Sequence, residues 1–408
     1  MSKANRREFF KIAGSASVAV FLTGASTFCA SNPRKQDEGF DIEDQIDPWI
    51  ELNLDNLASN VNEVRKRIGA RPIIAVVKCN AYGHGAVEIA SALQNNSKVY
   101  HFAVVKVREG LILRQNNIQG MILNMGFFNR REAKEVIQQN ISQSVFSDAV
   151  DVLAEEAHKL GRQAKVHICL DTGMGRVGVP HREALPFIEK VAAMPNIQIE
   201  GIFTAMTEDD DFNPIQIRRF ESICDAAKKK SIDVGIRHAA ASAEVDRYPY
   251  AYLDMVRPGN CLVGLEPERQ LNMKIKPVMS FKTRVVYVKK MVAGESLSYH
   301  RAYKITKETL IATLPCGYSD GYPAVVSNKA DVLIRGRRHR LVAPITANHM
   351  MVDITGSEDI KIGDEVVLWG KQGSERITKV ELENLAPEAT NTYRMATRMR
   401  TYLRRVTV

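Results

Sequence analysis

Between residues 48 and 279, short apolar runs alternate with longer stretches in which apolar residues recur every three or four positions. The short runs predict buried strands, and the longer stretches predict amphipathic helices. Repeated βα units imply a parallel sheet, and their number favours a closed (β/α)8 barrel of the TIM type over a doubly wound sheet. The expected strand and helix pairs are 73–77 with 87–93, 102–105 with 108–113, 121–123 with 131–138, 166–170 with 182–193, and 197–203 with 215–229, followed by a strand at 236–239 and a segment ending at 255–256.

From residue 280 to residue 408 the pattern changes to short β-rich runs separated by turns, with a helical pattern only at 378–385. This texture predicts a separate, mostly β domain after the barrel. The expected strands are 279–288, 309–314, 332–334, 351–354, 365–369 and 402–408.

Residues 1–30 differ from the rest of the chain. Arg6 and Arg7 precede the apolar stretch 12–22, which is too short to cross a bilayer, and small residues follow. This segment resembles a twin-arginine export signal and predicts a periplasmic protein. The alternative is a basic amphipathic helix kept on the mature protein. Phe28 argues against lipidation of Cys29, and the polar, acid-rich residues 31–47 predict a linker.

Composition restricts the possible functions. The chain has 408 residues, of which 45% are hydrophobic and 25% charged, as in globular proteins. The formal net charge of +9 suggests nucleic acid, but outside 335–340 and 394–405 the basic residues are spread out, and no aromatic stacking pattern accompanies them. We therefore expect no nucleic-acid partner and, since no other apolar run is long enough, no stable membrane span. The six cysteines lack metal-site spacing, so we expect no metal.

Lys78 closes the apolar run 73–77 and is followed by a turn that contains Gly83 and Gly85. Its amine therefore emerges at the C-terminal end of a predicted strand, where barrel enzymes place their chemistry. Burial favours the neutral form of an amine, and a neutral amine can form a Schiff base. On this segment alone, a lysine that merely extends its stem towards water explains the pattern as well.

Four segments occur in order between Trp49 and the C-terminus: Ala-Val-Val-Lys-Cys-Asn-Ala-Tyr-Gly-His-Gly at 75–85, Asp-Thr-Gly-Met-Gly-Arg-Val-Gly at 171–178, Met-Val-Arg-Pro-Gly at 255–259 and Ser-Tyr at 298–299. Together they resemble the alanine racemase family of pyridoxal-phosphate enzymes. The resemblance implies a barrel joined to a β domain, a head-to-tail homodimer with shared active sites, and interconversion of free L- and D-amino acids.

The resemblance also assigns catalytic roles. Lys78 would carry the cofactor and act as one proton-transfer base, and Tyr299 of the partner subunit would be the second base on the opposite face. Because a tyrosine ordinarily has a pKa near ~10, it needs help to ionise. His238 and Arg257 match positions that form a hydrogen-bonded chain to it. Arg257 would also face the pyridine nitrogen without releasing its proton, which favours proton return over transamination.

Further residues match positions that hold the cofactor. Tyr82, Ser242 and the amides of Gly259 and Asn260 match phosphate-binding positions. Tyr402 serves there only if the register slips by one residue. Arg176 corresponds to an arginine at the cofactor's phenolic oxygen, and its alternative is an ordinary charge at the barrel rim.

Four departures from the family pattern concern the substrate. Cys169 replaces a modified lysine, so Arg176 needs another partner such as chloride or Asp171, and Ala205 replaces a histidine. Ala347 and Asn348 stand where alanine-specific members usually have Met and Asp. With Arg176 and Tyr318, they are the predicted substrate-binding residues.

These changes predict a wider pocket and a broad-specificity racemase that still accepts alanine. A strict alanine racemase, a decarboxylase of the same fold and a catalytically silent cofactor-binding protein remain alternatives.

Overall fold

The computed structural model describes residues 46–265, 271–387 and 392–408. The predicted signal at 1–30 and all but the end of the predicted linker at 31–47 lie outside the described residues. Within these ranges, no helix is both long and apolar enough to cross a membrane.

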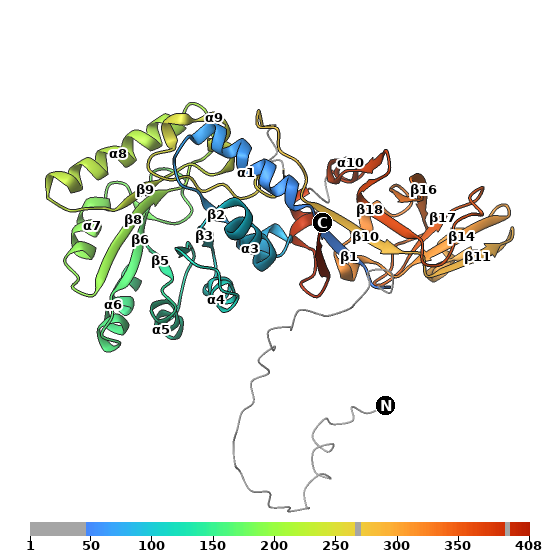
Figure 1. The fold of residues 1–408 in the computed structure, drawn as a ribbon, viewed down its shortest axis with the longest axis horizontal. Coiled ribbons are helices and arrows are strands. Elements are labelled where there is room, and N and C mark those ends of the chain that lie inside the picture. The colour runs from blue at the N-terminus through green and yellow to red at the C-terminus, as the bar shows by residue number, and fades with distance from the viewer. Residues whose placement is uncertain (1–45, 266–270, 388–391) are drawn as a thin grey trace, which may run out of the picture. The chain divides into compact units, whose positions relative to one another are not determined.

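The barrel follows Leu52 in the chain and consists of parallel strands that begin with β2 (Ile74–Val76) and end with β9 (Ile236–His238) (Figure 1). The eighth position in the ring is occupied by Met255 and Val256, which make isolated parallel bridges to His238 and Ile73. The amide of Ile74 donates to the carbonyl oxygen of Val256 at 2.8 Å, which helps to close the ring. The predicted α/β barrel is thereby confirmed. Its strands, in hydrogen-bonded order, are β2 (Ile74–Val76), β3 (His101–Val104), β4 (Ile122–Asn124), β5 (Ser142–Val145), β6 (Ala164–Asp171), β8 (Ile197–Thr204) and β9 (Ile236–His238), with the short β7 (Val179–Pro180) beside β6.

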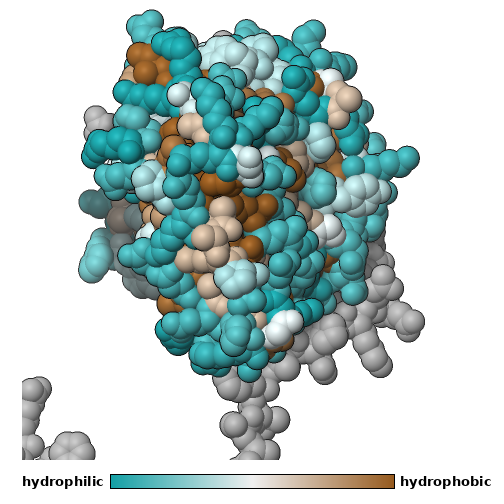
Figure 2. All heavy atoms as spheres, turned by 90° about the vertical axis from the view of Figure 1, so that its left-hand side faces the viewer, coloured by the Kyte–Doolittle hydropathy of each residue, from teal (hydrophilic) through white to brown (hydrophobic). Residues whose placement is uncertain are grey.

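Helices surround these strands in Figure 1. They are α1 (Leu54–Ile68), α3 (Ala86–Ser97), α4 (Val107–Gln115), α5 (Arg130–Gln138), α6 (Ala149–Lys159), α7 (Ala184–Ala192), α8 (Asn213–Lys229) and α9 (Ser242–Arg247). Figure 2 views the barrel from the left of Figure 1 and shows hydrophobic residues near the centre of a largely hydrophilic face. Apolar atoms contribute much of any folded protein's surface, so this face alone identifies no partner.

The hydrophobic pattern did not predict the unit formed by β5 and α6. The strand reads Ser-Gln-Ser-Val, yet all four residues are buried. Gln143 accepts a hydrogen bond from Asn124 at 2.8 Å inside the barrel. Because this part of the interior is polar, no apolar run marks the strand.

The C-terminal domain is a ten-stranded sheet, which confirms the predicted mostly β architecture. The run expected at 279–288 is two strands, and α11 (Thr392–Thr397) was not predicted, whereas α10 (Lys379–Asn384) was. The strands are β10 (Met279–Arg284), β11 (Tyr287–Met291), β14 (Thr309–Leu314), β15 (Asp331–Ile334), β16 (Arg337–Val342), β17 (Met350–Asp353), β18 (Glu365–Gln372), β19 (Glu375–Ile377) and β20 (Arg404–Thr407), with β1 between β10 and β20; β12 (Ser296–Leu297) and β13 (Tyr303–Lys304) form a separate hairpin.

The strand β1 (Trp49–Leu52) corrects the expected extent of the barrel, residues 48–279. It pairs antiparallel with β10 and parallel with β20, so it belongs to the C-terminal sheet. Glu51 also forms an ion pair with Lys282 at 2.8 Å. The described part of the chain thus begins in the β domain with β1 and enters the barrel through α1. The predicted barrel range therefore included four residues that belong to the other sheet.

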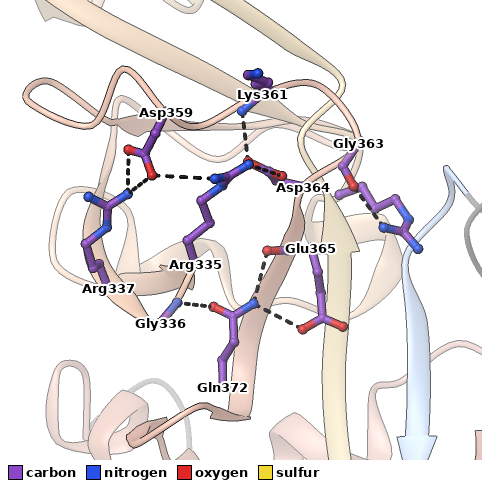
Figure 3. Close-up of polar contacts among 10 residues, drawn as sticks. Arg335, Gly336, Arg337, Asp359, Lys361, Gly363, Asp364, Glu365 and Gln372 are labelled. Carbon is purple, nitrogen blue, oxygen red and sulfur yellow. Dashed lines mark hydrogen bonds and ion pairs between the residues drawn. The ribbon is translucent and has the colours of Figure 1, made fainter.

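The basic cluster at 335–340 is matched by carboxylates (Figure 3). Arg335 binds Asp364 at 2.7 Å, and Arg337 binds Asp359 at 2.6 Å. Such exposed pairs contribute little stability individually. They do neutralise the charge that a nucleic-acid partner would need.

A left-handed turn follows β2. The backbone angle φ is positive at four successive residues, 54° at Cys79, 57° at Asn80, 49° at Ala81 and 53° at Tyr82. Left-handed backbone costs roughly 1–2 kcal/mol for each non-glycine residue, so surrounding contacts must hold the turn.

The contacts that hold this turn come from both domains. Glu109 of α4 accepts hydrogen bonds from the amides of Cys79 at 2.6 Å and Val105 at 3.1 Å. Arg405 of β20 donates to the carbonyl oxygen of Gly83 at 2.8 Å. Gly83 has φ of 87°, and an added Cβ would lie 1.8 Å from the carbonyl oxygen of Ala396. The turn after Lys78 therefore depends on the C-terminal domain.

Replacing Gly83 tests this packing. We expect Gly83→Ala to lower the free energy of unfolding by more than about 3 kcal/mol, because a backbone clash adds to the conformational cost. Gly161→Ala is the matched control, since Gly161 has φ of 60° and no atom within 4 Å of an added Cβ. It should lose only about 1 kcal/mol. Urea unfolding at one fixed protein concentration measures both, and equal losses would contradict the packing argument.

Candidate functional site

Lys78 lies where β2 ends and the left-handed turn begins. Its side chain is half-buried and makes no hydrogen bond or ion pair with any residue in the described ranges. The amine is therefore not committed to a structural role in the part of the chain that the structure covers.

A cradle of neutral donors lies close to Lys78. The hydroxyl of Tyr82 packs against Gly259, where an added Cβ would come within 2.4 Å of the hydroxyl oxygen. The amides of Gly259 and Cys261 donate to Ser242 Oγ at 3.0 and 3.4 Å. Tyr82, Ser242 and Gly259 are thus brought together as predicted, with Asn260 next in the chain. Only glycine at 259 lets the tyrosine approach this closely.

Arg257 is buried beneath the same end of the barrel. Its guanidinium donates to the carbonyl oxygens of Thr204 at 2.8 Å and Ala239 at 3.0 Å and lies over the Phe203 ring. Burial lowers the pKa of Arg257 to about 10, so the guanidinium stays charged at neutral pH.

A hydrogen-bonded chain leads from Arg257 into the barrel. Arg257 contacts His238 Nδ1 at 2.7 Å, His238 Nε2 contacts His167 Nδ1 at 2.8 Å, and His167 Nε2 contacts Glu200 at 3.4 Å. Arginine has only donors, so His238 Nδ1 must accept. His238 then donates to His167, which donates to Glu200. Every proton in the chain therefore points from the cation towards the carboxylate.

The electrostatics of this chain agree with two neutral imidazoles. Burial lowers the pKa of His238 well below its ordinary value, and Arg257 adds to the effect. Burial also lowers the pKa of His167, although Glu200 opposes this. For Glu200, burial opposes ionisation, but hydrogen bonds from His167 and Ser142 outweigh it and lower the pKa to about 2. The chain thus separates a cation from an anion.

Sequence reasoning missed His167 and Glu200. The available signal was Glu200 itself, a charged residue inside the apolar run 197–203, because buried charges require a partner. Glu200 is the extra residue at a register shift between β6 and β8. Bulges of this kind turn a side chain in a new direction. Gly201 makes room for His167, since an added Cβ would lie 2.5 Å from that imidazole.

The expected chain from His238 and Arg257 runs to Tyr299 of the partner subunit and stays a prediction. Tyr299 stands on a short helix of the β domain, η3 (Tyr299–Arg301), and is 75% exposed. Its hydroxyl makes no hydrogen bond with a described residue of its own subunit. Within one subunit, the observed chain runs from Arg257 through His238 and His167 to Glu200.

At the rim, Asp171 was one of the two partners considered for Arg176, and the structure does not show that pair. Arg176 is exposed and makes no ion pair with a described residue. Asp171 is not its partner, because the Asp171 carboxylate accepts from the amides of Gly173 and Gly175 at 2.9 and 3.1 Å. Cys169 is buried, and burial raises the pKa of its thiol to about 12. A neutral thiol does not replace a negative charge at this position.

The predicted substrate residues of the β domain lie together. Asn348 donates to Ser319 Oγ at 3.0 Å, and that hydroxyl donates to the carbonyl oxygen of Ala347 at 2.5 Å. Tyr318 precedes Ser319 and is 53% exposed. Tyr402 is engaged nearby, since its hydroxyl donates to Asp320 at 2.8 Å, so its predicted phosphate contact requires breaking that bond.

Comparisons with known proteins agree over most of the chain. The family model for the alanine racemase N-terminal domain matches residues 52–267, and the C-terminal domain model matches 278–407. The alanine racemase of Clostridium tetani is 39% identical over 347 residues, covering 83% of this chain and 89% of that protein. That of Symbiobacterium thermophilum is 38% identical over 353 residues, covering 85% and 93%.

Solved structures share the fold. The alanine racemase of Clostridium difficile 630 superposes with a TM-score of 0.83 at 31% identity, covering 89% of this chain and 96% of that one. A histidine racemase from Leuconostoc mesenteroides subsp. sake gives 0.81 at 24% identity, covering 90% and 99%, which concerns the fold alone.

The fold and the site define a barrel protein that uses pyridoxal phosphate. The chain belongs to the alanine racemase family, whose enzymes use pyridoxal 5′-phosphate. The residues fit this cofactor, because Lys78 offers an amine beside neutral donors that suit a phosphate, and Arg257 is the buried cation.

The pH dependence of stability tests the charge on Glu200. A lowered pKa means that its contribution is present above the unfolded value near ~4.3 and is lost as the pH falls towards about 2. Glu200→Gln should therefore cost about 1–3 kcal/mol at pH 7 and progressively less below pH ~4.

The control is Glu155→Gln, which removes an exposed ion pair with Arg130. It should leave the free energy of unfolding nearly unchanged at every pH, because solvent screens an exposed pair. Denaturant titrations from pH 3 to pH 8 measure the difference. A Glu200→Gln loss that does not vary with pH would show that the carboxylate is not ionised in the folded protein.

Proposed function

We propose that the protein is an amino-acid racemase in which Lys78 of one subunit and Tyr299 of its partner exchange the α-proton of a free amino acid. The observation that carries the proposal is the division of the site. An uncommitted amine lies beside the cradle on the barrel, while the tyrosine and the substrate residues project from the β domain.

The bound cofactor would supply electron withdrawal from the α-carbon, which makes the α-proton removable. Lys78 Nζ then takes or gives this proton on one face, and Tyr299 Oη does so on the other. Removal on one face and delivery on the opposite face inverts the α-carbon. The same two groups, in exchanged roles, carry out the reverse reaction.

Arg257 restrains the chemistry to proton exchange. It is charged at neutral pH and donates to His238, whose accepting nitrogen faces it. An arginine that keeps its proton leaves a neighbouring pyridine nitrogen unprotonated. This disfavours the long-lived carbanion that decarboxylation and transamination require. The decarboxylase alternative is therefore the weaker one.

The homodimer is part of the proposal. Tyr299 is exposed in its own subunit and makes no bond there to His238 or Arg257. A head-to-tail dimer would bring the β domain of one subunit to the barrel of the other, so that both subunits contribute residues to each site.

We further propose broad specificity. Ala347 and Asn348 present a methyl group and an amide next to Tyr318, which leaves room for side chains longer than that of alanine. Strict alanine specificity is the second candidate, and it is favoured by relatives at 37–39% identity that are named alanine racemases.

Export through a twin-arginine signal at residues 1–30 is also proposed, on the pattern around Arg6 and Arg7. Replacing both arginines by lysine should retain the protein in the cytoplasm. Unchanged fractionation of the Arg6→Lys/Arg7→Lys protein would exclude this route.

A chiral assay tests function and specificity together. We expect the purified protein with pyridoxal phosphate to convert the L forms of alanine, lysine, arginine, serine and methionine. The double variant Ala347→Met/Asn348→Asp should lower kcat/KM for lysine and arginine at least ~10-fold, because the thioether fills the pocket, and alanine less than ~3-fold.

The matched control is Val380→Met, which adds the same side chain at an exposed position of α10. It should leave all five rates unchanged. Turnover of alanine alone by the unaltered protein supports the strict alternative, and the absence of any D product contradicts the racemase proposal.

A further inference from the structure

A polar cavity of about 520 Å³ lies at the end of the barrel opposite Lys78. Most of its residues lie at or before the starts of β3, β4, β5 and β6, whereas Lys78 follows the end of β2. The volume lies within the range of small-molecule sites. The lining residues are His101, Arg114, Gln119, Gly120, Met121, Asn140, Ser142, Lys165 and Glu200.

The charges of this cavity suit an anion. The lining contains the cations Arg114 and Lys165 and one carboxylate, that of Glu200, so it carries one excess positive charge. Arg114 is fixed in place by backbone carbonyl oxygens, among them those of Gly120 and Asn140 at 2.8 Å. These acceptors hold the guanidinium without neutralising it.

Two groups are available to contact a ligand directly. Lys165 binds Glu200 at 3.3 Å and is 36% exposed, so it has further donors to offer. His101 Nδ1 is buried and has no hydrogen-bond partner among the described residues. An unpartnered buried nitrogen is costly, and a bound polar molecule would satisfy it.

Glu200 connects the cavity to the candidate active site. It lines the cavity and also ends the chain through His167 and His238 to Arg257. An anion that draws Lys165 away would remove positive charge from Glu200 and so alter the electrostatic field along this chain. Glu244 and Cys169 also face Arg257, but neither lines the cavity.

We propose that this cavity binds a small monoanion with a carboxylate or phosphate group, and that occupancy is coupled through Glu200 to the cofactor site. The binding half stands on the cavity alone. The coupling rests on the proposed function and is reciprocal. If the anion changes the affinity for the cofactor, the cofactor changes the affinity for the anion by the same factor.

Binding is tested on the holoenzyme, so that the cofactor's own phosphate occupies its cradle. We expect isothermal titration with acetate or inorganic phosphate to show one site per chain. Lys165→Met should weaken it at least ~10-fold, because the direct cation is lost. Lys190→Met is the control, since Lys190 is also ion-paired, with Asp148 and Asp151, but lies on α7.

Separate titrations with acetate and with phosphate show whether the cavity prefers a carboxylate or a phosphate group. His101→Leu is a second variant that removes the unpartnered imidazole and should also weaken binding. If neither probe gives heat at ~10 mM, the cavity does not bind an anion. If Lys165→Met binds a probe as tightly as the unaltered protein, Lys165 makes no charge-assisted contact and the proposed site is wrong.

Coupling is read from the absorbance of the bound cofactor as a function of pH, independently of turnover. An anion in the cavity favours the protonated form of the group whose titration changes the cofactor's absorbance. The pH midpoint of that absorbance change should therefore move to higher pH when the better-binding probe is added. Glu200→Gln should retain binding and abolish this movement. A midpoint that does not move in the unaltered protein, or one that still moves in Glu200→Gln, overturns coupling through Glu200. A protein that binds the probe but racemises nothing contradicts the proposed function and leaves the cavity site intact.

Discussion

The position of Lys78 depends on four successive residues held in left-handed backbone conformation. At roughly 1–2 kcal/mol each, Cys79 to Tyr82 would not keep this shape in an isolated peptide. Glu109 from the barrel and Arg405 from the last strand hold the turn from opposite sides. Tyr299 stands in a similar environment, because φ is also positive at Ser298, His300 and Arg301. Both proposed bases thus adjoin residues with strained backbone, which is typical of functional sites.

The second organising feature is the separation of charge across the barrel. A buried arginine and a half-buried carboxylate are both costly when alone. Here Arg257 and Glu200 are joined by two neutral imidazoles whose donors all point the same way. The arrangement satisfies every group in the chain and keeps the arginine charged. This chain of hydrogen bonds also connects the charge on Glu200, at the far end of the barrel, to Arg257 on the cofactor side.

Sequence alone predicted those parts of the fold that depend on apolar patterning. The barrel strands at 74–76 and 197–204 are apolar runs and were expected, whereas β5 is polar inside and was not. The range predicted for the barrel included β1, because pairing with β10 and β20 is a long-range property that no local pattern encodes. Tyr82, Ser242 and Gly259 were expected together through family resemblance. His167 and Glu200 were missed, because their role follows from a bulge and from the room that Gly201 leaves.

The central claim is that each active site is shared between two subunits, and subunit mixing tests it most directly. Lys78→Ala and Tyr299→Phe should each be inactive alone. Unfolded together in equal amounts and refolded with pyridoxal phosphate, they should recover about a quarter of the unaltered activity, because half of the dimers are mixed and each has one intact site. If mixed dimers form and no activity returns, Lys78 and Tyr299 do not act across the interface, and the account is wrong.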